Sequence, residues 1–122
     1  MLQTALQCSV VEAAEKIKKS LQEKGFTLFA DIDHQANAHS VDLELAASRL
    51  LIFGNPVAGT KLLQSDINIS LDLPLRLAIV EKEGRVYLLH QETKDFTEKY
   101  QVSDHPVLEK VADLFATLVS EL

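Results

Sequence analysis

The sequence contains no tryptophan, one cysteine, three prolines and four glycines among its 122 residues. The lone Cys8 can form no internal disulfide and has no thiol partner for a zinc site, which favours a reducing compartment. No apolar run approaches the ~20 residues that cross a bilayer, and the amino terminus lacks the basic start and long apolar core of a signal peptide. We therefore expect a cytoplasmic protein without a membrane partner.

Positive charge is also scarce, because 12 basic residues stand against 18 acidic ones, for a formal net charge of -6. The only basic cluster is the ordinary helix face of Lys16, Lys18 and Lys19, so a nucleic-acid partner is not expected. A chain of 122 residues with 47% hydrophobic content suits one domain with a real core. There is no linker, repeat or low-complexity segment, and we treat residues 1–122 as a single domain.

Apolar residues at helical spacing predict a first helix from about Val10 to Lys24. Ser9 followed by Glu12 is typical of a capping box at the start of a helix. Gly25 supplies the left-handed position at its end. These signals indicate structure and carry no information on function.

A closing helix is predicted from about Pro106 to Leu122, with Pro106 in its first turn and Ser103 or Asp104 as the cap. Its apolar stripe is broad. Such a stripe can bury against a sheet and still leave apolar surface for a second subunit.

Alternating and apolar runs predict the strands. They are a short strand near Leu2 to Gln7, a half-buried strand from Phe26 to Ile32, a strand at Leu50 to Phe53, and a hairpin of Leu75 to Glu81 with Arg85 to His90. Residues 50–53 are apolar on both faces, which predicts a central strand covered on each side, and residues 37–47 are expected to form a loop with one helical turn at most. Together these elements indicate an α+β domain with helices on one side of an antiparallel sheet.

The segment LLIFGNPVAGT, residues 50–60, has features of a phosphate-binding loop. A P-loop requires Lys before Ser or Thr, whereas here Thr60 precedes Lys61, and Pro56 lacks one of the N–H groups that would hold phosphate. A nucleotide hydrolase is therefore not expected, and Pro56 and Gly59 are expected to shape the exit of the chain from the sheet. A weaker anion site at the start of a helix near Thr60 stays open.

Asp33 and His34 follow a strand and are the candidates for acid–base chemistry, since imidazole titrates near pH ~6.5. Adjacent strand residues point to opposite faces, so Asp72 is a better partner for His34 than Asp33 is. A histidine hydrogen-bonded to loop backbone is the structural alternative. His34, His39 and Asp31 form too small a ligand set for zinc, so neither a metal nor a cofactor is expected.

Two further polar residues belong to the same hypothesis. The simplest interpretation of Asn55 is a turn residue that bonds its own backbone two residues on. Arg76 faces away from the apolar row of its strand and can pair with an acid or bind an anion. A polar small-ligand site of mixed charge would form if all the candidate residues converge: Asp33, His34, Asn55, Gly59, Thr60, Asp72 and Arg76.

Three segments, in order and spacing, resemble the bacterial and archaeal domain-of-unknown-function family 302, or DUF302: FADIDHQANAH, LLIFGNPVAGTKLLQ and LDLPLRLAIVEKEGRVY. The resemblance implies a β-α-β(4)-α order, similar to half of a TATA-binding-protein-like architecture and commonly assembled as a homodimer. It implies no established activity. The chain departs from the family pattern at Val41 to Leu45, where Gly-Leu and Pro are usual, and at Tyr87, where Trp is common.

Three functions follow as hypotheses. The preferred one is a homodimeric module that binds a small polar or anionic ligand at the loops of His34, Asn55 and Asp72. The second is an enzyme that uses His34 as a general acid or base. The third is a structural or protein-interaction domain with no ligand site, in which His34 and Asn55 are buried by protein.

Overall fold

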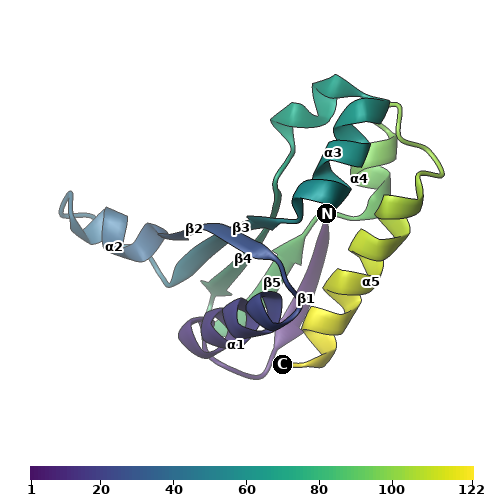
Figure 1. Ribbon diagram of the computed structural model, residues 1–122. Coiled ribbons are helices and arrows are strands. Elements are labelled where there is room, and N and C mark those ends of the chain that lie inside the picture. Colours follow the sequence, from purple (N-terminus) through teal and green to yellow (C-terminus); the bar gives the residue numbers. More distant parts are fainter.

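The computed structural model describes residues 1–122 as one five-stranded antiparallel sheet with helices (Figure 1). The strands lie in the spatial order β1-β5-β4-β3-β2, with the bounds β1 (Leu2–Leu6), β2 (Thr27–Asp33), β3 (Ser48–Gly54), β4 (Leu75–Lys82) and β5 (Arg85–His90). The helices are α1 (Val10–Glu23), α2 (His34–His39), α3 (Pro56–Ser65), α4 (Thr93–Thr97) and α5 (Pro106–Ser120), with a short 3-10 helix, η1 (Ile67–Leu71). None of these helices combines the length and the apolar character needed to cross a membrane.

The α+β class and the β-α-β(4)-α order are confirmed, because α1 and α5 flank the run of four strands β2 to β5. The shorter helices are additions to this order. Helix α2 lies between β2 and β3, α3 and η1 lie between β3 and β4, and α4 precedes α5.

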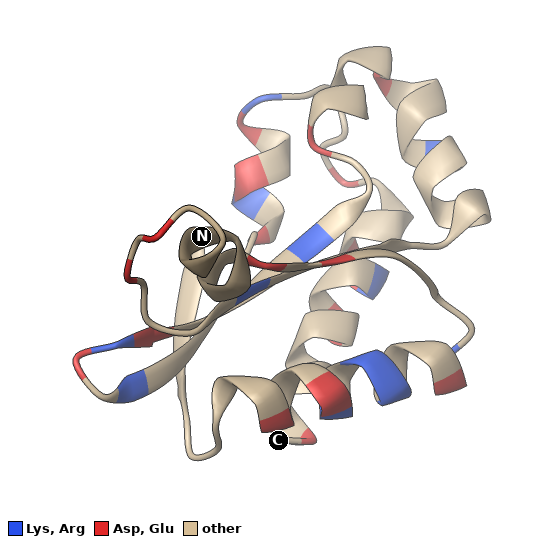
Figure 2. Ribbon diagram, turned by 90° about the vertical axis from the view of Figure 1, so that its left-hand side faces the viewer, with Lys and Arg blue, Asp and Glu red and all other residues tan.

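Helix α1 begins and ends close to the predicted positions. The Ser9 Oγ accepts a hydrogen bond from the Glu12 N–H at 3.1 Å, and Gly25 follows the helix with φ +81°. The capping box is only half formed, because the Glu12 side chain does not accept the return bond from the Ser9 N–H. Its apolar positions are buried against the sheet, and its outer side carries both acidic and basic residues (Figure 2).

Helix α5 is capped by a residue that we did not expect. The Nδ1 of His105 accepts a hydrogen bond from the Val107 N–H at 3.2 Å. The prediction of Ser103 or Asp104 as the cap is wrong, since Asp104 has a left-handed φ of 59° whereas an N-cap residue is usually extended.

The two faces of the sheet differ in burial. Side chains that share a core with α1 and α5 are 0–7% exposed: Leu51, Phe53, Leu75, Leu77, Ile79 and Leu88. Alternate residues on the same strands, such as Leu50 and Ile52, point to the other face, are only half-buried and do not join that core. The expectation that residues 50–53 are covered on both sides is therefore wrong for the single chain, because both long helices lie on one face. We call the other face the open face.

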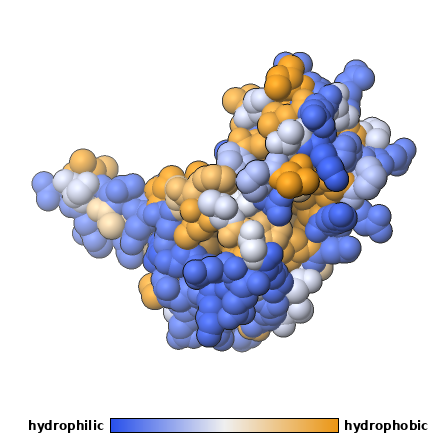
Figure 3. Space-filling model, viewed as in Figure 1, coloured by the Kyte–Doolittle hydropathy of each residue, from blue (hydrophilic) through white to orange (hydrophobic).

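The connection from β2 to β3 projects away from the body (Figures 1 and 3). It begins with α2 and continues without regular structure to β3, and none of its residues from 34 to 47 is buried. Val41, Leu43 and Leu45 in it are 64%, 62% and 46% exposed. We call residues 34–47 the arm.

Candidate functional site

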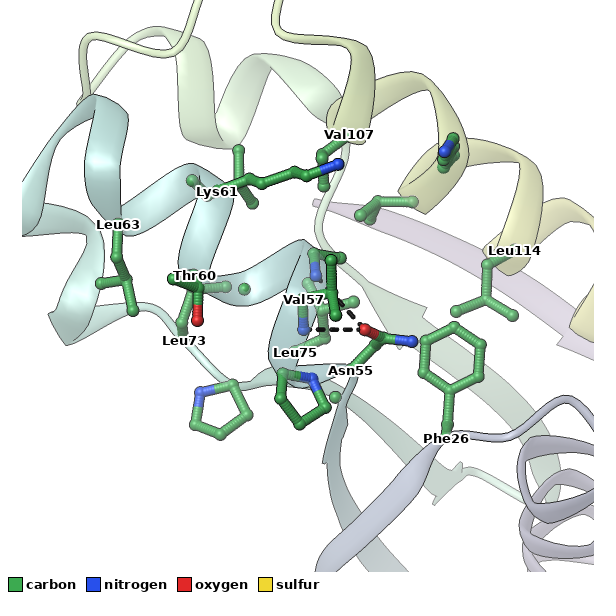
Figure 4. Close-up of a pocket in the computed structure, with 18 of the residues that line it drawn as sticks. Phe26, Asn55, Val57, Thr60, Lys61, Leu63, Leu73, Leu75, Val107 and Leu114 are labelled. Atoms are coloured by element: carbon green, nitrogen blue, oxygen red, sulfur yellow. Dashed lines mark hydrogen bonds between the residues drawn. The ribbon is translucent and has the colours of Figure 1, made fainter.

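A cavity of ≈ 580 Å³ lies beneath α3 (Figure 4). Its walls are α3, the Leu73–Pro74 segment before β4, and the first half of α5, with Phe26 and Phe29 at the entry to β2. Most of the lining is apolar: Phe26, Phe29, Pro56, Val57, Ala58, Leu62, Leu63, Leu73, Pro74, Leu75, Val107, Val111 and Leu114. A concave apolar site of this size with a few polar groups is typical of small-molecule sites.

Asn55 brings a polar group to this cavity. Its Oδ1 accepts hydrogen bonds from the N–H groups of Val57 at 2.9 Å and Ala58 at 3.2 Å. The bond to Val57 is the predicted one to the backbone two residues on, and together the two bonds make Asn55 the N-cap of α3. Its Nδ2 carries the two remaining donors and points toward the ring of Phe26 (Figure 4). The amide therefore fixes the helix with one end and offers N–H groups to the cavity with the other.

The start of α3 is not an open anion site. The helix begins at Pro56 rather than near Thr60, and its first N–H groups are already occupied, because Asn55 Oδ1 takes two of them and the Asn55 carbonyl takes that of Gly59 at 2.9 Å. The anion site that the sequence left open at the start of a helix near Thr60 is therefore not formed, because no helix begins there. Gly59 and Thr60 nevertheless line the cavity from within α3.

The charged residues of the cavity are all of one sign. Lys61 from α3 and Lys110 from α5 line it, and no Asp or Glu does, although the whole chain has 18 acidic residues. In Figure 4 the Lys61 side chain extends along the top of the cavity toward Val107. The rim is thus basic in a chain whose net charge is -6.

Gly59 is a second unusual feature of this wall. It lies inside α3 without a positive φ, and a Cβ built on it would meet no atom within 4 Å. Glycine inside a helix is less stable than alanine by roughly 0.5–1 kcal/mol. No packing contact in the chain explains this glycine.

Asp33 and His34 lie at the other end of the sheet. In the antiparallel pair β2–β3, Thr27 is opposite Gly54 while Asp33 is opposite Arg49, which separates His34 from Asn55 by roughly 20 Å of strand. Asp33 caps α2 through a hydrogen bond from the Ala36 N–H at 2.9 Å, and His34 is exposed at the start of the arm. His34 therefore does not line the cavity beneath α3.

Asp72 and Arg76 are close to the cavity but do not line it. Asp72 accepts hydrogen bonds from the Tyr100 hydroxyl and from Arg76 Nη2, the latter at 3.1 Å. The Asp72 carboxylate raises the pKa of Tyr100 by holding its phenolic proton. These contacts tie the start of β4 to the segment after α4.

The condition for the predicted polar site, that all three loops converge, is therefore not met. Asn55, Gly59 and Thr60 share a cavity, Asp72 and Arg76 pair beside it, and Asp33 and His34 lie at the far end of the sheet. His34 and Asp72 do not meet, so the acid–base pair suggested by the sequence does not form. Asp31, the third group of the suggested metal set, is bound by Arg49 and Lys18.

Phe26, Lys110 and the apolar residues of α5 were not among the candidates. They carry no motif, and only the packing of α5 against α3 brings them to the cavity. The one local signal of this cavity in the sequence is Gly59, because glycine is unfavourable inside a helix. It becomes visible only once residues 56–65 are identified as a helix.

A second cavity of ≈ 600 Å³ lies on the other side of α5, between α4 and the ends of β1 and β5. His90 lines it, with the ring stacked on Phe115 at 4.3 Å between centroids and Nδ1 2.8 Å from the Gln91 carbonyl. The Gln91 Oε1 is buried there without a hydrogen-bond partner.

A known family and a solved structure match this chain over nearly its whole length. The family model described as "Domain of unknown function DUF302" matches residues 2–121. A solved structure, described as an uncharacterized conserved protein DUF302 from Bacillus stearothermophilus, has a TM-score of 0.84 and covers 98% of this chain and 95% of that chain. Its identity is 14%, so this likeness concerns the fold alone.

Curated relatives match over a shorter stretch. "Fluoride-specific ion channel FluC 1" of Brucella suis biovar 1 (strain 1330) is 41% identical over 81 residues, which are 66% of this chain and 32% of the channel chain. The channel of the same name from Brucella abortus biovar 1 (strain 9-941) is also 41% identical over 81 residues, or 30% of its length. The match thus spans about a third of these relatives.

Proposed function

We propose a binding function for this chain, which belongs to the family described as Domain of unknown function DUF302. The proposed ligand is a small and mostly apolar molecule with one anionic or hydrogen-bond-accepting group. The observation that carries the proposal is the cavity beneath α3, which is apolar in its walls and has lysines as its only charged lining residues. This proposal replaces the preferred hypothesis from the sequence, in which a small polar or anionic ligand lies among three converging loops, because those loops do not converge.

The apolar walls support a hydrocarbon or aromatic body for the ligand. Each buried CH₂ group contributes about 0.8 kcal/mol, so a chain of six or seven carbons gives several kcal/mol before the cost of association is subtracted. The cavity volume of ≈ 580 Å³ is within the usual range for such ligands.

The polar groups support an acceptor at one end of the ligand. Asn55 Nδ2 and the ammonium groups of Lys61 and Lys110 are all donors, and the cavity has no carboxylate to repel an anion. Charge-assisted hydrogen bonds from such donors are roughly twice as strong as neutral ones. A carboxylic acid with an apolar tail fits this combination.

Titration calorimetry with octanoate as the probe tests the proposal. We expect saturable binding with a Kd below about 1 mM, and binding of 1-octanol that is weaker by about tenfold because it lacks the charge. Lys61→Gln should weaken octanoate binding about three- to tenfold, whereas Lys99→Gln, an exposed lysine outside the cavity, should leave it unchanged.

The blocking variant is Gly59→Leu, whose side chain would enter the open space beside α3. It should abolish octanoate binding while the protein keeps its thermal stability, because leucine is a better helix former than glycine. Absence of octanoate binding to the wild type, or equal binding to Gly59→Leu, would overturn the proposal.

A second candidate function follows from the curated relatives, which are described as fluoride-specific ion channels. On this candidate the chain acts as an accessory domain in fluoride resistance. The cavity beneath α3 is far too large and too apolar to bind fluoride itself, so the domain would act on a channel rather than on the ion. Deletion of the gene should then lower the fluoride concentration that the host tolerates, and unchanged tolerance would contradict it.

A further inference from the structure

The second cavity, between α4, α5 and the ends of β1 and β5, has a volume of ≈ 600 Å³ and apolar walls. Those walls include Leu2, Phe96, Leu108, Ala112, Ala116 and Val119. The two exposed alanines are one turn apart on α5 and leave space that larger side chains would fill. A concave site with apolar walls and a few polar groups is typical of small-molecule sites.

His90 offers a hydrogen-bond acceptor to the second cavity. Its Nδ1 lies 2.8 Å from the Gln91 carbonyl oxygen. Because a carbonyl oxygen can only accept, Nδ1 carries the proton, and the neutral ring has its lone pair on Nε2. Nε2 makes no hydrogen bond within the chain and keeps accessible surface. It can therefore accept a hydrogen bond from a ligand.

Gln91 supplies a second acceptor. It lines the second cavity, and its Oε1 is buried without a hydrogen-bond partner. A buried acceptor that stays unpaired costs the desolvation of that group, and most such atoms in proteins are paired. The Gln91 side chain is only half-buried and its terminal torsion is broad, so a rotation brings Oε1 to a donor in the cavity. The chain itself supplies no such donor.

The charged residues of the second cavity are already paired. Lys94 Nζ lies 3.6 Å from Glu92 Oε2, and the N-terminal ammonium group lies 3.5 Å from the same oxygen. The free polar atoms are therefore His90 Nε2 and Gln91 Oε1, together with threonine hydroxyls that can donate or accept. The cavity beneath α3 has the reverse character, with two lysines and no carboxylate. The two cavities thus suit different ligands.

The ring of His90 also favours a planar ligand. Phe115 covers one face of the imidazole, with 4.3 Å between the ring centroids and 5° between the planes. Because Phe115 does not line the second cavity and His90 does, the opposite face of the imidazole is the one left for a ligand. Aromatic rings stack favourably in offset arrangements.

We propose that the second cavity binds a neutral, planar aromatic molecule that carries an N–H donor, such as an aromatic carboxamide or a heterocyclic amine. The N–H group donates to Gln91 Oε1 or His90 Nε2. The ring of the ligand stacks on His90 and packs against the apolar walls. This site is separate from the cavity beneath α3 and does not depend on the function proposed for it.

A ¹H–¹⁵N correlation spectrum of the full chain, titrated with benzamide, tests the proposal. Saturable shifts should occur at the backbone amides of residues 90–94 and 112–119, which border the second cavity. N,N-dimethylbenzamide keeps the ring and the carbonyl but has no N–H, so it should bind about three- to tenfold more weakly. No saturable shift, shifts confined to residues 57–63 beneath α3, or equal affinity for the two amides would overturn the proposal.

Gln91→Met removes the acceptor and keeps the length of the side chain. It should weaken benzamide binding about three- to tenfold without lowering the thermal midpoint of unfolding, because Oε1 has no hydrogen bond to lose in the ligand-free chain. Gln22→Met, at an exposed glutamine of α1 outside the cavity, is the matched control and should bind as wild type does. Unchanged binding to Gln91→Met would contradict the proposal.

A blocking variant tests the location independently of Gln91. Ala112→Leu places a larger side chain in the second cavity and should abolish benzamide binding, whereas Thr117→Leu, at an exposed position of α5 outside the cavity, should leave it unchanged. Circular dichroism checks that both variants keep their helices. Wild-type affinity in a folded Ala112→Leu would show that benzamide binds elsewhere and would overturn the proposal.

Discussion

Among single residues, Asn55 has the clearest structural role. Its Oδ1 receives both hydrogen bonds that start α3, and its Nδ2 faces the cavity. The sequence analysis interpreted Asn55 both as a turn residue and as a ligand candidate. The Oδ1 atom fulfils the first role, and the Nδ2 atom is available for the second. The capping role can be tested without any ligand.

Replacing Asn55 with alanine should lower the free energy of unfolding by about 1 kcal/mol, since Ser, Thr, Asn or Asp caps contribute roughly that amount. Urea unfolding followed by circular dichroism measures it. Asn37→Ala in the arm, where the asparagine is exposed and caps no helix, should change stability by less than about 0.5 kcal/mol. Equal losses in the two variants would argue against the cap.

Asp31 is the residue most perturbed by its charged neighbours. Arg49 Nε donates to its Oδ1 at 2.8 Å and Lys18 Nζ donates to its Oδ2 at 2.9 Å. The hydrogen bonds from Arg49, with help from Lys18, lower the pKa of Asp31 to about 2 from its ordinary value of 3.8. This cluster fastens α1 to β2 and β3.

The lowered pKa of Asp31 gives a pH dependence of known sign. The folded chain binds the proton less readily than the unfolded chain, so the stabilisation of about 2 kcal/mol is complete above pH 4 and is lost as pH falls through about 2. Urea unfolding of wild type and Asp31→Asn at pH 5, 4, 3 and 2 should show a difference that shrinks toward pH 2. A difference that stays constant with pH would contradict this role.

Among the elements, α3 contains a residue that lowers its helical stability, the interior Gly59. Gly59 lies in its interior beside open space, whereas Gly25 ends α1 with φ +81°. Alanine could therefore replace Gly59 without strain. It could not replace Gly25, whose positive φ is unfavourable for an L-residue.

Gly59→Ala should raise the free energy of unfolding by roughly 0.5–1 kcal/mol, because alanine suits a helix interior and meets no neighbour within 4 Å. Gly25→Ala should lower it by about 1–2 kcal/mol, because an L-residue is strained at that φ. Thermal and urea unfolding of both variants measure the pair. A destabilised Gly59→Ala would show that the glycine is needed for folding and would weaken the case for a space kept for ligand.

On the scale of the whole molecule, the elements with local signals could be predicted from sequence. The ends of α1 are fixed by Ser9 and Gly25, and the β4–β5 hairpin by its Gly84 turn, where φ is +78°. The direction of each strand decides at which end of the sheet its following loop lies. Asp33 ends β2 and Asn55 follows β3, and because these strands are antiparallel neighbours the two residues lie at opposite ends of the sheet.

Other parts of the site depend on tertiary packing. The cavity forms only because α5 returns along α3 and brings Val107, Lys110 and Leu114 against it. No local pattern specifies that contact. The open face similarly follows from the position of α1 and α5 on one side, whereas the apolar character of residues 50–53 on both faces was already visible in the sequence.

The most direct measurement on the cavity is a ¹H–¹⁵N correlation spectrum of the full chain titrated with octanoate. Saturable shifts should occur at the backbone amides of residues 55, 57–63, 73, 75 and 107–114, which surround the cavity beneath α3. The amides of the arm and of residues 32, 50, 78 and 89 on the open face should not move. No saturable shift, or shifts confined to the second cavity beside His90, would contradict a ligand site beneath α3.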